Sequence, residues 1–543
     1  MHATTRSTGG LFVAAGLCLF AMTPARAGVV WSGYAGDAQH TALSSVASQA
    51  LSVIRWQTPV DLAPQYSGTS LLIHYGSPVV TAADTVIVPV KTGATGGFEV
   101  QARNGGTGGV LWTQTSDYVL PPHNWTPSYG PALAPSGRLY MPGAGGTIVF
   151  RDNPDSPSGA TGRIAFFGDT AYAANSTAFD NNVYVTTPIT SDAAGNIYFG
   201  YKVTGTNPAN LQSGIARISA SGAGSFVTAA AASGDSGITQ VAANSAPALS
   251  PDGSTIYVAV STGNFGRGDL VALNSTTLAT TSVRPLLDPV SGNAALIPDD
   301  GTASPTVAPD GRVYFGVLEN PFRSSKGWLL SFGADLSTSS TRPPGGFGWD
   351  DTVSIVPRTM VPSYAGTSSY LLMAKYNDYA GLGGTGVNRL AILDPTVAAV
   401  DPRTGATVMN IVMSIAGPTP DAEFPGLAGA VREWCINTAA VDPFTDSVLV
   451  NSEDGKLYRW RLDTNTFTEQ IVLTPGIGEA YTPTLIGGNG LVYAINNGTL
   501  FAVGAANSVP EPSGLAALGC AALLLGFIRR PRAAVRTGPR WGC

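Results

Sequence analysis

Two short segments bring charged and aromatic side chains together in a chain that is otherwise poor in charge. Charged residues make up only 12% of its 543 residues, about half the share in an average soluble protein. Such mixtures are typical of a polar pocket, but paired loop charges or sheet-edge contacts would give the same pattern. The segments are Lys375-Tyr376-Asn377-Asp378-Tyr379 and Arg432-Glu433-Trp434-Cys435, with Glu479 shortly before Tyr481. If the protein is an enzyme, its candidate catalytic residues are Lys375, Asp378, Arg432, Glu433 and Glu479.

Two acidic runs could supply oxygen ligands to a hard cation such as Ca²⁺. They are Trp349-Asp350-Asp351 and Asp299-Asp300-Gly301. Aspartate also caps turns, and this is the role that we expect for both runs. The sequence therefore predicts no metal site.

The cysteines exclude several chemistries. Cys18 and Cys520 lie in apolar segments near the two ends and Cys543 is terminal, so Cys435 is the only thiol in the body of the chain. One thiol builds neither a disulfide framework nor a Cys-based zinc site, and its simplest role is that of a small buried hydrophobic residue. The sequence also lacks CxxCH, HExxH, GxSxG and P-loop patterns.

The charge balance argues against a nucleic-acid partner. Seven of the 29 basic residues and one of the 35 acidic residues lie in the two terminal segments. The body, residues 28–508, thus has 22 basic and 34 acidic residues, a net charge of −12. An acidic body without clusters of lysine and arginine lacks the electrostatic footprint of nucleic-acid binding.

One phrase recurs along the body: a proline, an apolar pair, a turn, and a β-rich run that ends near an aromatic residue. The intervals between its first six copies are 53, 57, 59, 58 and 57 residues, and the last interval of 121 residues is about two such steps. A copy without proline at 438–450 fits that gap, so we count eight units. The phrase begins at Pro78, Pro131, Pro188, Pro247, Pro305, Pro362 and Pro483.

The composition of each unit predicts short strands joined by tight turns. Pro251-Asp252-Gly253 and Pro309-Asp310-Gly311 are hairpin turns in type, because proline presets φ and glycine accepts a positive φ. Four-stranded antiparallel sheets repeated around an axis form a β-propeller. We predict an all-β, single eight-bladed β-propeller over 28–508, whose last blade is completed by a strand near Arg55-Trp56. The long interval 362–438 should hold an inserted loop; two unrelated β-sandwiches are the alternative architecture.

The units resemble the repeats of pyrroloquinoline-quinone (PQQ) propellers. The segment Val100–Trp112 nearly matches the motif Ala-x-(Asn/Asp)-x-x-Thr-Gly-x-x-x-Trp at the end of those repeats, with one extra residue. The segment Val400–Gly405 matches it in part. The opening Trp31–Ser44 is similar to the start of quinoprotein dehydrogenases. Catalytic members of that family hold the quinone beside a Ca²⁺-type ion, and many place two adjacent cysteines over its ring. This body has one cysteine, so that element is absent, and the calcium ligands have no match residue by residue.

The first 27 residues are typical of a cleaved signal peptide. A basic start is followed by the apolar run Leu11–Met22, the breaker Thr23-Pro24 and the small-x-small sequence Ala25-Arg26-Ala27. Cleavage between Ala27 and Gly28 follows as the expected processing site. A buried N-terminal helix is the alternative.

The last segment, 509–543, resembles the PEP-CTERM sorting signals of bacteria that make exopolysaccharide. It has a Pro510-Glu511-Pro512 tripeptide, an apolar run and a basic end. The apolar run is only 14 residues, so it predicts a short transmembrane helix with its arginines on the cytoplasmic side. The anchor residues are Leu515, Leu518, Leu523, Leu524, Leu525, Phe527, Ile528, Arg529, Arg530 and Arg532.

Export and a propeller together leave two classes of function. One is a non-enzymatic binding or scaffold module without a cofactor, with polysaccharide or an envelope protein as its partner. The other is a periplasmic PQQ-dependent oxidoreductase, with PQQ and Ca²⁺ as cofactors. The missing quinone machinery favours the first. The PEP-CTERM resemblance implies signal peptidase and exosortase as processing enzymes, a transient stay in the inner membrane, and a final place in the cell envelope or matrix of a Gram-negative bacterium.

Overall fold

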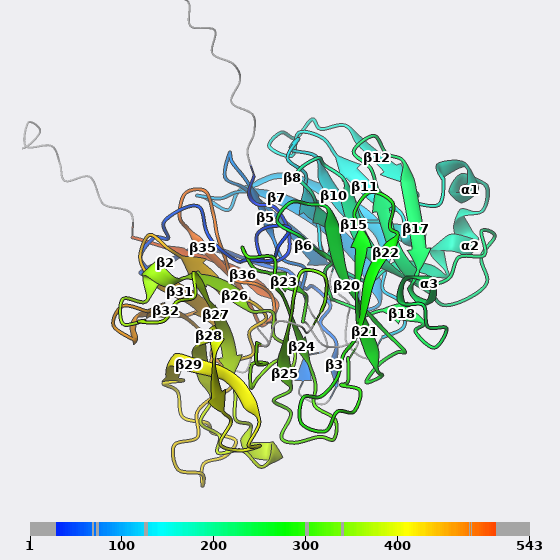
Figure 1. Ribbon diagram of the computed structural model, residues 1–543. Coiled ribbons are helices and arrows are strands. Elements are labelled where there is room, and N and C mark those ends of the chain that lie inside the picture. The colour runs from blue at the N-terminus through cyan, green and yellow to red at the C-terminus, as the bar shows by residue number, and fades with distance from the viewer. Residues whose placement is uncertain are drawn as a thin grey trace, which may run out of the picture.

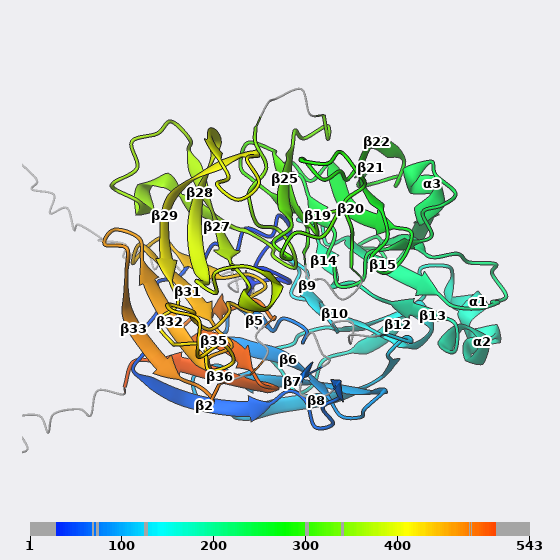
Figure 2. The same ribbon diagram turned by 90° about the horizontal axis from the view of Figure 1, so that it is seen from below.

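The computed structural model contains eight antiparallel sheets arranged as the blades of one ring (Figure 2). It describes residues 29–506 apart from 68–69, 72–74, 124–128, 299–302, 338–341, 477 and 479–480. The predicted signal peptide with Ala27 and Gly28, the tripeptide Pro510–Pro512 and the anchor lie outside these residues. Among the described residues, no helix is both long and apolar enough to cross a membrane.

The first four blades follow one another along the chain. Blade 1 is β5 (Val79–Thr81), β6 (Thr85–Lys91), β7 (Gly96–Asn104) and β8 (Val110–Val119), with β1 (Val29–Trp31) added next to β5. Blade 2 is β9 (Ala132–Leu133), β10 (Leu139–Pro142), β11 (Ile148–Arg151) and β12 (Thr161–Ile164). Blade 3 is β13 (Val183–Val185), β14 (Thr190–Ser191), β15 (Ile197–Val203), β16 (Gly214–Ile218) and β17 (Gly224–Thr228). Blade 4 is β18 (Gln240–Val241), β19 (Ala248–Leu249), β20 (Thr255–Ser261), β21 (Gly268–Asn274) and β22 (Thr280–Pro285).

The other four blades complete the ring. Blade 5 is β23 (Thr306–Val307), β24 (Val313–Val317) and β25 (Trp328–Phe332). Blade 6 is β26 (Ser354–Pro357), β27 (Tyr370–Tyr376), β28 (Arg389–Val400) and β29 (Thr407–Ala416). Blade 7 is β30 (Ala440–Asp442), β31 (Ser447–Asn451), β32 (Lys456–Arg461) and β33 (Thr466–Val472). Blade 8 is β34 (Leu485–Ile486), β35 (Val492–Asn496), β36 (Thr499–Gly504) and β2 (Val53–Pro59).

Few described elements lie outside the blades. The short helices α1 and α2 follow blade 2 and α3 follows blade 3, and all three lie at the outer edge of the ring (Figure 1). These elements are β3 (Tyr66–Ser67), β4 (Ser70–Leu71), α1 (Asp169–Ala174), α2 (Ser176–Asp180), α3 (Ala229–Ser233), and the 3₁₀ turns η1 (Ala144–Gly146), η2 (Arg358–Met360) and η3 (Ala380–Leu382).

Blade 8 confirms the predicted closure. Its outermost strand, β2, comes from the start of the body and pairs antiparallel with β36, so that Gln57 lies opposite Phe501 (Figure 2). The Trp56 indole Nε1 then donates to the Gly105 carbonyl of blade 1 at 2.6 Å. The first and last parts of the chain thus share one sheet, in which β2 covers the edge of β36.

The hydrophobic core lies in layers between neighbouring blades. One layer joins Leu371 and Ile392 of blade 6 to Val448 and Trp460 of blade 7. The middle strands are buried on both faces because a neighbour covers each face, and β6 is buried at all seven positions. The outer strand β33 instead alternates between exposed and half-buried residues. This arrangement explains why the repeats show short apolar runs rather than long alternating ones.

Two details of the predicted repeat are wrong, although the count of eight is right. Pro362 does not precede an innermost strand: β26 already ends at Pro357, and Pro362 lies in the connection to β27. The residues directly before the inner strand of this blade are Thr352-Val353, not a proline. Pro362 therefore marks the connection after the inner strand and not its start. Among the residues that the structure describes, blade 5 has three strands, with one isolated bridge from Leu329 to Gly345 in place of the fourth. Two prolines just before Gly345 explain this, because proline cannot donate a ladder hydrogen bond.

The predicted insertion is present in blade 6. The strands β28 and β29 form a long hairpin, and the chain then runs from Ala416 to Ala440 before β30 begins. Within that connection only an isolated bridge, Pro420 to Val431, adds regular pairing. This connection leads directly into the residues of the site described below.

An N-terminal segment lies against the innermost strands of successive blades. Residues 32–44, named here the axial segment, follow β1 and accept backbone hydrogen bonds from blades 2, 4, 5, 6 and 7 in chain order. Tyr34 and His40 of this segment are buried. The donor and acceptor pairs, at 2.7 to 3.0 Å, are Leu133 with Ser32, Leu249 with Ala38, Val307 with Gln39, Ile355 with Thr41 and Val441 with Ala42.

Candidate functional site

Three connections next to strands of blades 6 and 7 carry charged side chains toward one another. They are the turn before β26, the chain between β29 and β30, and the tight turn between β31 and β32. The buried strand β27 adds a lysine near its end. Electrostatic interactions link the members of the group across these elements. We call the group the axial cluster; its members are Asp350, Asp351, Lys375, Glu433, Cys435 and Glu453.

Lys375 forms a buried ion pair at one side of the axial cluster. Its ammonium contacts Asp350 Oδ1, and the two side chains are only 1% and 7% exposed. The Lys375 backbone N–H donates to Asp351 Oδ2 at 3.3 Å. The rings of Phe347 and Tyr481 lie 5.8 and 5.4 Å from the ammonium. Burial alone would lower the pKa of Lys375, but the two aspartates outweigh it and raise that pKa, so the lysine stays charged.

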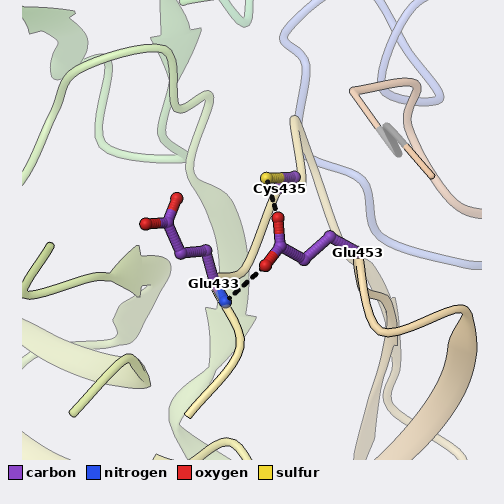
Figure 3. A group of neighbouring side chains, drawn as sticks. All are labelled: Glu433, Cys435 and Glu453. Atoms are coloured by element: carbon purple, nitrogen blue, oxygen red, sulfur yellow. Dashed lines mark hydrogen bonds between the residues drawn. The ribbon is translucent and has the colours of Figure 1, made fainter. Parts of the chain in front are cut away.

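Glu433, Cys435 and Glu453 face one another on the other side (Figure 3). Glu453 accepts from the Glu433 backbone N–H at 2.9 Å and from the Cys435 thiol at 3.3 Å. The Glu433 carboxyl group lies across a gap from these two side chains (Figure 3). Their ligand atoms all lie within 4.8 Å of one another, close enough for one cation to contact all three.

An asparagine holds this segment in place. Asn377, at the end of β27, accepts from the Trp434 backbone N–H at 3.1 Å and donates to the Trp434 carbonyl at 3.2 Å. Trp434 itself is buried between blades 6 and 7. The side chains before and after this anchored tryptophan, Glu433 and Cys435, are therefore fixed relative to β27.

The carboxyl groups of the axial cluster are poorly compensated. Burial, with Glu453 as a second cause, raises the pKa of Glu433 to about 8. Burial also raises the pKa of Glu453, and that of Asp351 well above its ordinary value. The cluster has four carboxyl groups and one ammonium, and Glu453 is the only one of the four that Arg432 reaches, at 4.0 Å. A buried cluster with this excess of carboxyl groups must take up protons or a cation to offset its negative charge.

The residues chosen from the sequence divide into three sets. Lys375 and Glu433 belong to the axial cluster. Asp378 does not: it pairs with Lys326 at 2.8 Å, and although burial opposes this, hydrogen bonds lower its pKa to about 2. Arg432 is also a paired loop charge, 3.4 Å from Asp421. Glu479, with the acidic run at 299–301, lies outside the described residues.

The structure corrects the role expected for Asp350 and Asp351, and it adds Glu453 to the site. Asp350 and Asp351 were expected to cap turns, but both side chains are buried and bind Lys375. The turn is buried, and its two carboxyl groups reach the Lys375 ammonium and backbone N–H. Glu453 was missed because Glu453-Asp454-Gly455 has the composition of an ordinary hairpin turn. No signal in the sequence relates it to Cys435, 18 residues earlier.

The axial cluster does not fit PQQ. That cofactor is an anionic quinone, and its carboxylates need cationic partners. The ammonium of Lys375 is already paired with Asp350, and the remaining groups are mostly carboxyls. Cys435 donates to Glu453 and has no adjacent cysteine to form the pair known from the resembled family. The described residues thus favour a cation over an anionic quinone.

Comparisons with known proteins find similarity only among solved structures. No family model matches, and no curated protein matches in sequence. Among solved structures, quinohemoprotein alcohol dehydrogenase ADHIIG from Pseudomonas putida HK5 is 12% identical, with a TM-score of 0.48 over 94% of this chain and 83% of that one. The quinohemoprotein alcohol dehydrogenase from Comamonas testosteroni is 15% identical, with 0.46 over 90% and 82%. BamB from Moraxella catarrhalis is 12% identical, with 0.42 over 82% and 99%.

Proposed function

We propose that this protein is an exported, exosortase-processed β-propeller that acts as a binding module and takes a cation or a cationic group at its axial cluster. The observation that carries the proposal is the charge of that cluster, four carboxyl groups around one paired ammonium. A cation placed between Glu433, Cys435 and Glu453 would offset this charge without a change of fold. Nothing in the cluster requires chemical turnover of the ligand.

The ends of the chain support the exported part of the proposal. Residues 1–27 have the order of a signal peptide, and 509–543 have the order of a PEP-CTERM signal. Signal peptidase and exosortase would remove both ends and release the propeller to the cell envelope or matrix. A polysaccharide or an envelope protein is the partner that we propose there. Grooves between outer strands offer surfaces for it, including one of about 570 Å³ lined by Gln114, Asp117, Thr161 and Arg163.

Calorimetry with Zn²⁺ tests the binding site. Zn²⁺ is the probe because thiolate and carboxylate are both among its ligands. We expect binding that Glu433→Gln and Cys435→Ser weaken, and that Glu423→Gln leaves unchanged. Glu423 is the matched control, since its side chain is 60% exposed and pairs with Arg432 on the same connection. Because Glu433 is protonated below pH 8, binding should release protons and strengthen as the pH rises. Absent or unselective binding would contradict the proposal.

A second experiment tests the quinone alternative. The protein should show no dye-linked oxidation of alcohols or sugars when PQQ and Ca²⁺ are added. Turnover that is lost in Lys375→Ala or Asp378→Ala would overturn our proposal and favour the oxidoreductase. Lys375 is the sharper variant, because Asp378 pairs with Lys326 outside the axial cluster.

A further inference from the structure

We propose that Tyr34, from the axial segment, is a positioning residue of the axial cluster. This inference rests on the proposed function, because it concerns the geometry of that binding site. Tyr34 lies more than 300 residues before the cluster in sequence, and it does not touch the proposed cation. It would act by joining the two chain segments that carry the acidic groups.

The contacts of the Tyr34 hydroxyl carry the argument. It hydrogen-bonds Thr352 Oγ1 at 2.8 Å and donates to Asn437 Oδ1. Thr352 directly follows Asp351, and Asn437 comes two residues after Cys435. One phenol thus links the turn before β26 to the chain that enters β30, which are the two backbone segments on either side of the cluster.

The surroundings make this link rigid. Tyr34 is 5% exposed, and the His40 ring packs edge-on against it with 5.1 Å between centroids. The His40 Nδ1 contacts the Pro305 carbonyl at 2.7 Å. Burial raises the pKa of Tyr34 to about 12 and lowers that of His40 to about 4, so both are neutral near pH 7. A neutral, fully buried phenol keeps one hydrogen-bond arrangement across the physiological range.

The two segments are also bonded directly to each other. The Thr352 backbone N–H donates to the Asn437 carbonyl at 3.1 Å, and the Thr438 hydroxyl donates to the Thr352 carbonyl at 3.2 Å. Loss of the Tyr34 hydroxyl would therefore leave the blades joined. It would remove the phenol that bridges Thr352 and Asn437, whose side chains keep their contacts with the Ser304 backbone N–H and the Thr438 hydroxyl. The relative position of Asp351 and Cys435 would then be held less firmly. A variant that lacks only the Tyr34 hydroxyl can therefore separate a positioning role from a general role in folding.

The test uses the full chain with Cys18, Cys520 and Cys543 replaced by serine, so that Cys435 is the only thiol. The variant is Tyr34→Phe, which keeps the ring and removes the hydroxyl. The matched control is Tyr118→Phe, because Tyr118 is buried and its hydroxyl donates to the Val185 carbonyl of another blade at 2.6 Å. For each protein we would measure Tm, the rate of Cys435 alkylation by iodoacetamide, and the affinity for Zn²⁺.

We expect similar losses of Tm in both variants but a change at the site in only one. Tyr34→Phe removes the hydrogen bonds to Thr352 and Asn437, so it should alter the alkylation rate and weaken Zn²⁺ binding by about tenfold. Thr352→Val should reproduce this result, and Thr352→Ser, which keeps the hydroxyl, should behave as the parent protein. If Tyr34→Phe changes only Tm, as Tyr118→Phe does, the positioning role is wrong. If the parent protein binds no Zn²⁺, the proposed function fails, and the alkylation rates still decide the role of Tyr34.

Discussion

Replacing Glu433 with glutamine should remove a large part of the pH dependence of stability. In the folded protein, burial beside Glu453 raises the pKa of Glu433 from 4.5 to about 8. The unfolded chain releases this proton near pH 4.5, whereas the folded chain keeps it up to about pH 8. Between these values the folded state binds more protons, so its stability must fall as the pH rises. Glutamine has no proton to lose and should abolish this contribution.

The size of the effect follows from the pKa shift. One pKa unit corresponds to about 1.4 kcal/mol. For a group that titrates at 4.5 unfolded and at about 8 folded, integration from pH 5 to pH 8 gives a loss of about 3 kcal/mol. This is a large fraction of the stability of an ordinary domain. The stabilisation by the proton on Glu433 should be fully present below pH 4.5 and lost as the pH passes 8.

Urea unfolding at pH 5, 6.5 and 8 measures this contribution. The difference in unfolding free energy between the parent protein and Glu433→Gln should grow across the series by about 3 kcal/mol in favour of the variant. Glu423→Gln is the control and should run parallel to the parent, because that side chain is exposed. Parallel curves for the parent and Glu433→Gln would refute the reasoning, since they would mean that Glu433 is ionised in the folded state at neutral pH.

Three further outcomes are expected. Lys375→Met should lower the unfolding free energy by about 3–5 kcal/mol in urea titrations, because it leaves Asp350 buried without its partner; adding Asp350→Asn, which removes the charge and suits the positive φ of this position, should recover part of the loss, and no recovery would contradict the pairing. Gly108→Ala should lower Tm more than Gly137→Ala: both have positive φ, but the new Cβ would lie 2.6 Å from the Trp56 ring in the first and meet nothing in the second. Intact-mass analysis of protein from the native host should show loss of the leader and of everything after the Pro-Glu-Pro tripeptide; finding the last three residues would contradict processing, and recovery from the cytosol would contradict export.

The ring could be predicted because its repeats obey local rules. A proline lies just before the inner strand in six of the eight blades, and in five of these the hairpin that follows contains a glycine. Gly253 and Gly311 do have positive φ, at 71° and 82°. The strand positions were wrong at Thr352-Val353, where other residues stand in place of the proline before the inner strand. They were also wrong at Pro343-Pro344, which prevents a fourth strand in blade 5. Local chemistry thus gives the number of blades more reliably than the bounds of each strand.

The site could be predicted only in part, because it joins residues far apart in the chain. Charged residues in a charge-poor sequence are conspicuous, which is how Lys375 and Glu433 were found. The same rule selected Asp378, whose partner Lys326 lies on another loop. Glu453 and Tyr34 are ordinary by local criteria and gain their roles from contacts with Cys435 and Thr352. Only the closed ring creates these contacts.

The fold itself explains why the charged groups gather near the axis. The layers between blades are apolar, so a buried carboxyl group there would have no partner. The turns before the inner strands are different, because the axial segment supplies hydroxyl and backbone partners to them. That segment also leads into β2, the strand that completes blade 8. The same stretch of chain therefore closes the ring and holds Thr352 and Asn437 beside the axial cluster, which couples the stability of the ring to the geometry of the proposed binding site.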